Sequence, residues 1–175
     1  MSMVVKADPP ARGVGRPPRA ELRARVLIIE GRFYDHISDE LIGGAVAALD
    51  AQSVAYERVT VPGALEIPQV LAQAAASGLI PRRAENGKFD GAIVLGCVIR
   101  GETSHYDIVC NNANHWLMEV AIKHAIPVGN GILTVDTEAQ ALARAKGGIN
   151  GKGGDAARAC LRLIELQRVF EGQSA

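Results

Sequence analysis

The chain has 175 residues, a length that suits one domain and is enough to bury a single core. Hydrophobic residues make up 48% of it and aromatic residues only 4%, so we expect a core built mainly from Ala, Val, Leu and Ile. The 19 Lys and Arg residues balance the 19 Asp and Glu residues, and this neutral balance does not indicate a nucleic-acid partner or a membrane surface.

Residues 1–23 form a Pro-rich N-terminal segment that has little to bury. Its prolines stand among Arg and Gly residues, and this composition predicts a flexible tail ahead of one domain that spans residues 24–175. Five arginines could suggest a nucleic-acid contact, namely Arg12, Arg16, Arg19, Arg23 and Arg25. They are diluted by Asp8 and Glu21 and have no aromatic residues between them, which favours a solvated tail.

Three features of the sequence indicate the cellular compartment of the protein, namely its cysteines, its N-terminus and the length of its apolar runs. Cys97, Cys110 and Cys160 are an odd number of thiols without C-x-x-C spacing, and the N-terminus has no apolar stretch of the signal-peptide type. No run approaches the roughly 18 apolar residues of a membrane span. We therefore expect reduced thiols in a cytoplasmic protein with no membrane partner.

From Arg25 onward, apolar runs alternate with helical apolar spacings. In chain order we predict a strand at 26–29, a helix at 38–49, a strand at 56–61, a helix at 65–76, a polar loop at 78–88, a strand at 91–98, a helix at 105–124, a strand at 127–135, and helices at 138–145 and 155–170. Continuous apolar strands separated by helices predict a parallel sheet covered on both faces. Ligands bind beyond the carboxyl ends of such strands, so we expect the polar turns that follow them to meet there, after Glu30, Val61, Ile99 and Val135.

The third strand runs into a polar turn at residues 100–104 that opens the helix beginning near His105. A turn of this kind points free backbone N–H groups and the positive end of the helix at one place, which predicts an anion site. Histidine transfers protons readily near neutral pH, so His105 is a candidate proton-transfer residue beside a bound anion. The alternative is a capped turn in which His105 only satisfies a backbone carbonyl, and these residues alone leave both interpretations open.

Further candidates for binding each have a simpler structural explanation. Phe33, just past the first strand, could stack on a flat heterocycle or pack at the start of a helix. Glu66 follows the tight turn Pro62-Gly63, where a carboxylate could contact a ligand or only offset the helix dipole. Arg144 and Lys152 flank a glycine-rich link and could close over an anion, or could be a solvated pair.

Several common motifs fail on spacing. Residues 147–153 are one residue short of a P-loop and follow a helix, and residues 129–131 lack the third glycine of a dinucleotide fingerprint. His105, His115 and His124 lie ten and nine residues apart instead of at the i, i+4 spacing of a helical zinc site, so we expect no metal. No nucleophile elbow is present, and we interpret Cys97 as a small buried thiol at the end of a strand.

Several separated segments, in the right order, together resemble the 6,7-dimethyl-8-ribityllumazine synthase family. The resemblance covers residues 25–170, and its segments are Gly31 to Asp35 (GRFYD), Val61 to Pro68 (VPGALEIP), Val98 to Asp107 (VIRGETSHYD), Gly131 to Thr134 (GILT), Glu138 to Ala141 (EAQA) and Arg144 to Asp155. It implies a three-layer α/β/α sandwich of the flavodoxin-like kind around a mainly parallel four-stranded sheet. It also implies the penultimate step of riboflavin biosynthesis, the condensation of 5-amino-6-(D-ribitylamino)uracil with 3,4-dihydroxy-2-butanone 4-phosphate, without a metal or an organic cofactor.

The resemblance assigns residues to the first substrate, the ribitylaminouracil. Phe33 resembles the aromatic residue that stacks on the pyrimidine. Ala64-Leu65-Glu66 resembles the segment that binds the ribityl chain, with Glu66 contacting its hydroxyl groups. Val98 and Ile99 resemble the residues that bind the pyrimidine edge through the backbone.

The resemblance also assigns residues to the phosphate and to proton transfer. Glu102-Thr103 matches the phosphate-binding turn, and His105 matches the proton-transfer residue. Arg144 resembles an arginine that reaches the phosphate from a neighbouring subunit. Lys152 and Asp155 match further pocket residues near the ribityl chain and the phosphate.

Some features depart from the family pattern. Asn130, a candidate pocket residue, stands where many members have a phenylalanine that closes the pocket from the adjacent subunit, and Cys97 replaces a common threonine. The loop at 78–88 is longer than in compact members, and the link at 145–152 differs from that of members that form icosahedral shells. We therefore expect a homopentamer rather than a particle of sixty subunits, with riboflavin synthase as a possible partner.

Two alternatives of other functional classes stay open. One is a catalytically weak paralogue that binds a flavin or lumazine, which Asn130 favours and the presence of both His105 and Arg144 disfavours. The other is a flavodoxin-like binding module, which the turn Gly31-Arg32-Phe33 disfavours because it lacks the Ser-, Thr- and Gly-rich phosphate loop of such modules.

Overall fold

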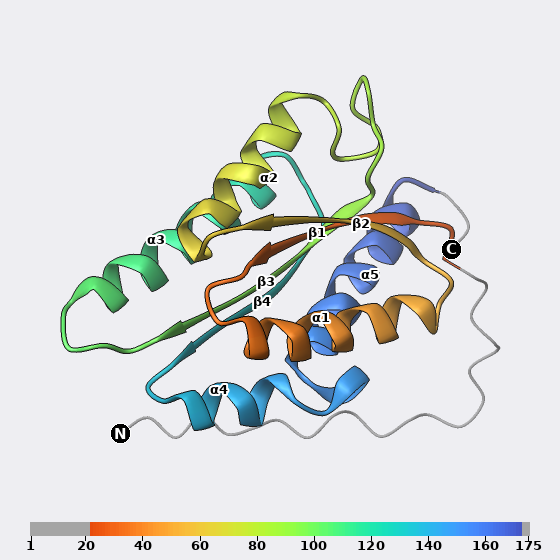
Figure 1. Ribbon diagram of the computed structural model, residues 1–175. Helices are drawn as coiled ribbons and strands as arrows, with labels where there is room; N and C mark the ends of the chain where they lie inside the picture. The colour runs from red at the N-terminus through yellow and green to blue at the C-terminus, as the bar shows by residue number, and fades with distance from the viewer. Residues whose placement is uncertain (1–21, 173–175) are drawn as a thin grey trace.

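The computed structural model describes residues 22–172, so most of the predicted tail, residues 1–21, lies outside the described residues. Strands and helices alternate along the chain, as Figure 1 shows. They are β1 (Arg25–Gly31), α1 (Asp35–Asp50), β2 (Ala55–Val61), α2 (Ile67–Ala76), β3 (Gly91–Ile99), α3 (His105–Lys123), β4 (Val128–Val135), α4 (Glu138–Ala145) and α5 (Lys152–Phe170). Two short 3₁₀ turns, η1 (Ala64–Glu66) and η2 (Gly148–Asn150), were not predicted from the sequence.

The four strands form one parallel sheet in the order β2-β1-β3-β4, which confirms the predicted fold class. Successive residues of a strand point to opposite faces, and the two faces carry separate apolar clusters. Val26 and Ile28 of β1 pack with α1, α4 and α5, whereas Leu27 and Ile29 pack with α2 and α3. The molecule is therefore a three-layer α/β/α sandwich, and Figure 1 shows α2 and α3 on one side of the sheet and α1 and α4 on the other.

The two long helices of the larger layer, α1 and α5, touch backbone to backbone. A Cβ atom placed on Gly153 of α5 would lie 1.9 Å from the Leu41 carbonyl oxygen of α1. One placed on Gly44 of α1 would lie 2.5 Å from the Gly148 carbonyl oxygen in η2. No side chain fits in either gap, and the glycines therefore set how closely the segment that joins α4 to α5 lies against α1.

Some boundaries differ from the prediction, each for a packing reason. The helix α5 starts at Lys152 instead of 155. Gly153 and Gly154 disfavour a helix by propensity, but a backbone carbonyl lies against each of them, from Leu41 of α1 at Gly153 and from Ile149 of η2 at Gly154. Leu22 lies within the range predicted as tail, yet it is 5% exposed and belongs to the core cluster on the α1 side. Ile80, in the loop predicted to be polar, is also buried. Among the helices of residues 22–172, none is long and apolar enough to span a bilayer.

Candidate active site

A pocket of about 340 Å³ lies at the carboxyl ends of β1, β2 and β3. The segments that follow these three strands form its walls, as predicted for a parallel sheet. The lining residues are Phe33 and Tyr34 after β1, Pro62 to Glu66 after β2, and Cys97, Val98, Ile99, Gly101, Thr103, His105, Tyr106 and Val109 at the end of β3 and the start of α3. The sequence candidates Phe33, Ala64-Leu65-Glu66, Val98-Ile99, Thr103 and His105 are thus brought together.

The first wall is the turn after β1, which carries Phe33. The Phe33 side chain is 71% exposed, so the alternative of ordinary packing at a helix start does not describe it. Its ring makes an edge-to-face contact with Tyr34, with the ring centroids 4.9 Å apart. An exposed aromatic face at the mouth of a pocket can stack on a flat heterocycle.

The second wall is the turn after β2, where η1 leads into α2. The Glu66 carboxylate accepts a hydrogen bond of 3.0 Å from the backbone N–H of Gly63. Glu66 therefore caps its own turn, a structural role other than the expected interaction with the helix dipole, and it also lines the pocket. The turns after β1 and β2 are in direct backbone contact, because a Cβ on Gly31 would lie 2.9 Å from the carbonyl carbon of Gly63.

The third wall is the turn between β3 and α3. His105 is the first residue of α3, and its backbone N–H donates to the Thr103 hydroxyl over 3.3 Å. The His105 side chain is exposed and lines the pocket beside the N-terminus of the helix. Glu102 is exposed in the same turn but is not among the lining residues. Free N–H groups of a first helical turn beside an imidazole can bind an anion and transfer protons.

Arg100 braces this turn against the end of β4. Its Nε donates to an Asp136 carboxylate oxygen over 2.8 Å, and its guanidinium lies 4.3 Å from the centre of the Tyr106 ring. The Arg100 backbone N–H also donates to the Val135 carbonyl. These contacts hold the pocket side of α3 in place without using the His105 side chain.

The chemical character of the pocket excludes a thiolate nucleophile. Cys97 is buried as expected, and burial raises the pKa of its thiol to about 11. Burial also raises the pKa of the Tyr106 phenol above its ordinary value. At neutral pH both groups stay protonated, so the thiol is not available as a nucleophile.

The cationic candidates occupy a second hollow of about 640 Å³, separate from this pocket. Arg144, Lys152 and Asp155 line it together with Thr134 and Val135 at the end of β4. Arg144 donates to the Gln140 carbonyl of its own helix over 3.0 Å, and Asp155 pairs with Arg158. The turn after Val135 contacts the turn after β3 through the Arg100–Asp136 pair and the start of α1 through the His36–Glu138 pair. Within residues 22–172 it does not line the pocket, because the end of β4 borders the second hollow.

Asn130 lies in β4 and, within residues 22–172, lines neither the pocket nor the second hollow. Its side-chain amide donates to the Asn114 oxygen of α3 over 2.8 Å, and its own oxygen accepts from the Ile132 backbone N–H over 2.9 Å. Both ends of the amide are thus engaged inside the chain.

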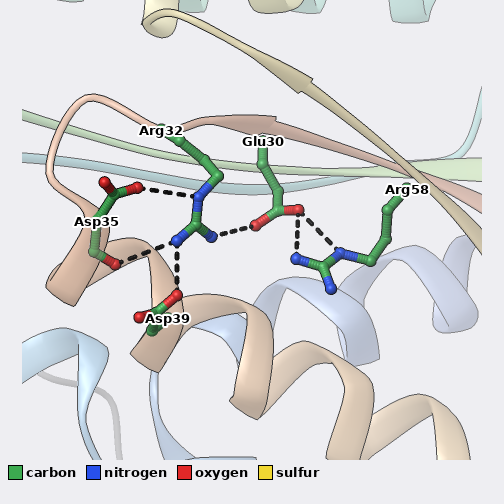
Figure 2. A network of polar contacts seen from close by, with 5 residues as sticks. All are labelled: Glu30, Arg32, Asp35, Asp39 and Arg58. Carbon is green, nitrogen blue, oxygen red and sulfur yellow. Dashed lines mark hydrogen bonds and ion pairs between the residues drawn. The ribbon is translucent and has the colours of Figure 1, made fainter.

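A buried ion network at the end of β1 was missed in the sequence. The Glu30 carboxylate is 1% exposed and lies between the guanidinium groups of Arg32 and Arg58, as Figure 2 shows. Two signals could have found it: Glu30 directly follows four apolar residues of a predicted buried strand, and Arg58 stands in the neighbouring strand. A charge at the end of a buried strand needs a partner of opposite sign.

Comparisons with known proteins agree on one family. A family model described as 6,7-dimethyl-8-ribityllumazine synthase matches residues 23–168. A protein of that name from Methylobacterium radiotolerans is 50% identical over 149 residues, which cover 85% of each chain. Proteins of the same name from Azorhizobium caulinodans and Xanthobacter autotrophicus are 51% and 50% identical over 145 and 148 residues, which cover 83% and 85% of this chain and 87% of each of theirs.

Proposed function

We propose that the pocket at the ends of β1, β2 and β3 is the substrate site of this chain, which belongs to the 6,7-dimethyl-8-ribityllumazine synthase family. The family's reaction condenses 5-amino-6-(D-ribitylamino)uracil with 3,4-dihydroxy-2-butanone 4-phosphate and releases phosphate and water. The observation that carries the proposal is the convergence of an exposed aromatic ring, a carboxylate and an imidazole on one pocket, from Phe33, Glu66 and His105. Identity of about half to synthases over most of the chain disfavours a relative that only binds ligands.

The pocket suits the uracil substrate on its two apolar walls. The pyrimidine ring stacks on Phe33, and its polar edge meets the backbone of Val98 and Ile99, where β3 ends. The ribityl chain extends toward Ala64-Leu65-Glu66, where a Glu66 oxygen can accept hydrogen bonds from its hydroxyl groups. The butanone phosphate then lies toward Thr103 and the first turn of α3, with its anionic group at the N-terminus of the helix.

The reaction needs proton transfers and close approach more than reactive side chains. The arylamine of the uracil attacks the ketone, and the carbinolamine loses water to give an imine. Phosphate then leaves and unmasks a second carbonyl group. The second amine adds to this carbonyl and a second water is lost as the ring closes. His105 is placed to take a proton from the attacking amine and to return one to a leaving oxygen. Alignment of two bound substrates can lower the barrier by about 7–11 kcal/mol in the ideal case, which explains a site with one strong acid–base group.

Within one chain this pocket holds few cations for a phosphate dianion, and Arg144 and Lys152 lie in the other hollow. We infer that the two hollows face each other across the contact between neighbouring subunits of a homopentamer, so that Arg144 of one subunit reaches the phosphate bound by the next. Substrates this polar, one of them phosphorylated, stay inside the cell that makes them, which supports a cytoplasmic site of action. Riboflavin synthase, which uses the lumazine product, is the expected functional partner.

Subunit mixing tests the shared site. His105→Ala and Arg144→Ala chains with different tags are co-expressed, mixed assemblies are purified, and formation of the lumazine is followed by its absorbance and fluorescence. In a random mixture, about a quarter of the subunit contacts pair an intact pocket wall with an intact Arg144, so activity should rise well above the mean of the two parents. Mixed assemblies no more active than that mean would place Arg144 and His105 of the same chain together. No lumazine from the unmutated protein would refute the activity itself.

A further inference from the structure

The carboxylate of Glu30 is buried at the carboxyl end of β1, on the sheet face covered by α1. One of its oxygens accepts from Arg32 over 3.0 Å, and the other accepts from Arg58 of β2 over 2.9 Å. A buried charge is tolerated when it is paired and hydrogen-bonded, and the loss of one partner leaves the other charges uncompensated. Glu30 therefore fixes where both guanidinium groups lie.

Arg32 connects Glu30 to the turn that follows β1. Its Nε donates to an Asp35 carboxylate oxygen over 3.2 Å, and its Nη2 donates to an Asp39 oxygen over 2.6 Å. Its backbone N–H donates to the Val61 carbonyl at the end of β2. Figure 2 shows the guanidinium in the middle of this group, with Glu30 on one side and the first turns of α1 on the other. The planar fork of arginine can hold all these partners at once, which an ammonium group cannot.

Phe33 depends on this turn for its position because it has little packing of its own. It is the next residue after Arg32, it is 71% exposed, and its ring contact is with its neighbour Tyr34. On the far side the turn meets the backbone of Gly63, so it cannot move inward. The direction in which the Phe33 ring projects is therefore set by how Arg32 is held.

We propose that Glu30 is a positioning residue for the pyrimidine site, which acts through Arg32 to hold the Phe33 ring in the pose that stacks on the substrate. This inference rests on the proposed function, because it takes Phe33 as the stacking residue. A ring held in its bound pose before the substrate arrives does not have to be ordered on binding, which favours affinity. Glu30 touches neither substrate, so its loss is felt in binding of the uracil and not in proton transfer.

The test compares Glu30→Gln with Asp90→Asn in the full-length protein. Asp90 is a matched control: it is also buried, and it also accepts from two arginines, Arg82 over 2.9 Å and Arg168 over 3.5 Å. It precedes β3 and thus lies at the opposite end of the strands from the pocket. Both variants exchange a buried carboxylate for an amide, so both should lose stability in thermal unfolding, but only Glu30→Gln should affect the pocket.

We expect Glu30→Gln to raise the KM for the ribitylaminouracil about tenfold, with kcat changed less than about twofold and the KM for the butanone phosphate unchanged. In the Phe33→Ala background, Glu30→Gln should have no further effect on that KM, since the residue through which it acts is gone. The dissociation constant of the lumazine product, measured by its fluorescence, should follow the same pattern.

Several outcomes overturn the proposal. If Glu30→Gln and Phe33→Ala have additive effects on the uracil KM, Glu30 does not act through Phe33. If Glu30→Gln and Asp90→Asn change that KM equally, the change reflects a general loss of stability. If Glu30→Gln does not fold, Arg32→Lys keeps a positive charge beside Glu30 but removes the fork, and an unchanged uracil KM in it refutes the inference. If Phe33→Ala itself leaves the uracil KM unchanged, the proposed role of Phe33 fails; if Phe33→Ala raises it and Glu30→Gln does not, only the role of Glu30 fails.

Discussion

At the scale of single residues, the proposed proton-transfer residue His105 lies on a different wall of the pocket from Phe33 and Glu66, the proposed binding residues. His105 has its backbone in the first turn of α3, where Thr103 accepts its N–H, and its side chain remains exposed to the pocket. Phe33 and Glu66 belong to the two other walls. Removing one of these side chains therefore leaves the backbone that places the others intact.

His105→Ala should lower kcat by about 10²-fold without abolishing turnover, because alignment of the two substrates survives the loss of the proton-transfer group. His115→Ala is the control: His115 lies on the same helix but pairs with Glu119 and does not line the pocket. Steady-state kinetics from pH 6 to 8 make the comparison. Full kcat in His105→Ala across that range would remove His105 from proton transfer.

The sequence predicted the residues that line the pocket better than it predicted the ion network around Glu30. Phe33, Val98-Ile99 and His105 lie at or just after strand ends, and a parallel sheet brings such positions to one edge. The pairing of Glu30 with Arg58 could not be predicted in the same way. It depends on the register of β1 against β2, which sets Ile28 beside Arg58 and cannot be deduced from the pattern of either strand alone.

At the scale of elements, periodicity predicted the helices and strands, and close contacts set their ends. Apolar runs such as Val26–Ile29 and Ile93–Leu95 identify buried strands directly. The start of α5 was missed because Gly153 and Gly154 are typical of a loop, and only the structure shows that the Leu41 carbonyl of α1 lies against Gly153. The same contact leaves no room for a side chain.

Gly153→Ala should therefore destabilise the fold by about 2–4 kcal/mol, since the added methyl group meets the Leu41 carbonyl at 1.9 Å and two helices must move apart. Gly43→Ala is the opposite case in α1: nothing lies within 4 Å of an added Cβ, and the gain in helix propensity should stabilise by about 0.5–1 kcal/mol. Urea unfolding of both variants measures the difference. Equal stabilities would mean that α5 shifts freely on α1.

At the scale of the whole molecule, one chain divides its candidate site residues between two hollows and exposes apolar side chains on α3. The strand-end turns meet, as Arg100–Asp136 and His36–Glu138 show, but the pocket and the cationic hollow are separate. In the proposed shared site, the arrangement of subunits brings Arg144 to His105, and neither periodicity nor motif spacing carries that information. The exposed apolar residues of α3 are the kind of surface that subunit contacts cover, namely Ile108, Trp116, Met118 and Ile122.

We expect the assembly to be a homopentamer, with a mass by light scattering or sedimentation of about five times the 18.5 kDa chain. The resemblance predicts that the link between α4 and α5 differs from that of members that form shells, and in the structure this link packs against α1 of its own chain. Gly147 and Gly148 take positive φ angles of 108° and 56°, and the Gly148 carbonyl lies against Gly44 of α1. A segment held this way keeps one shape and is not free to adjust to a second pentamer. Sedimentation near sixty chain masses would contradict the pentamer and leave the shared site standing, whereas an active monomer would contradict both.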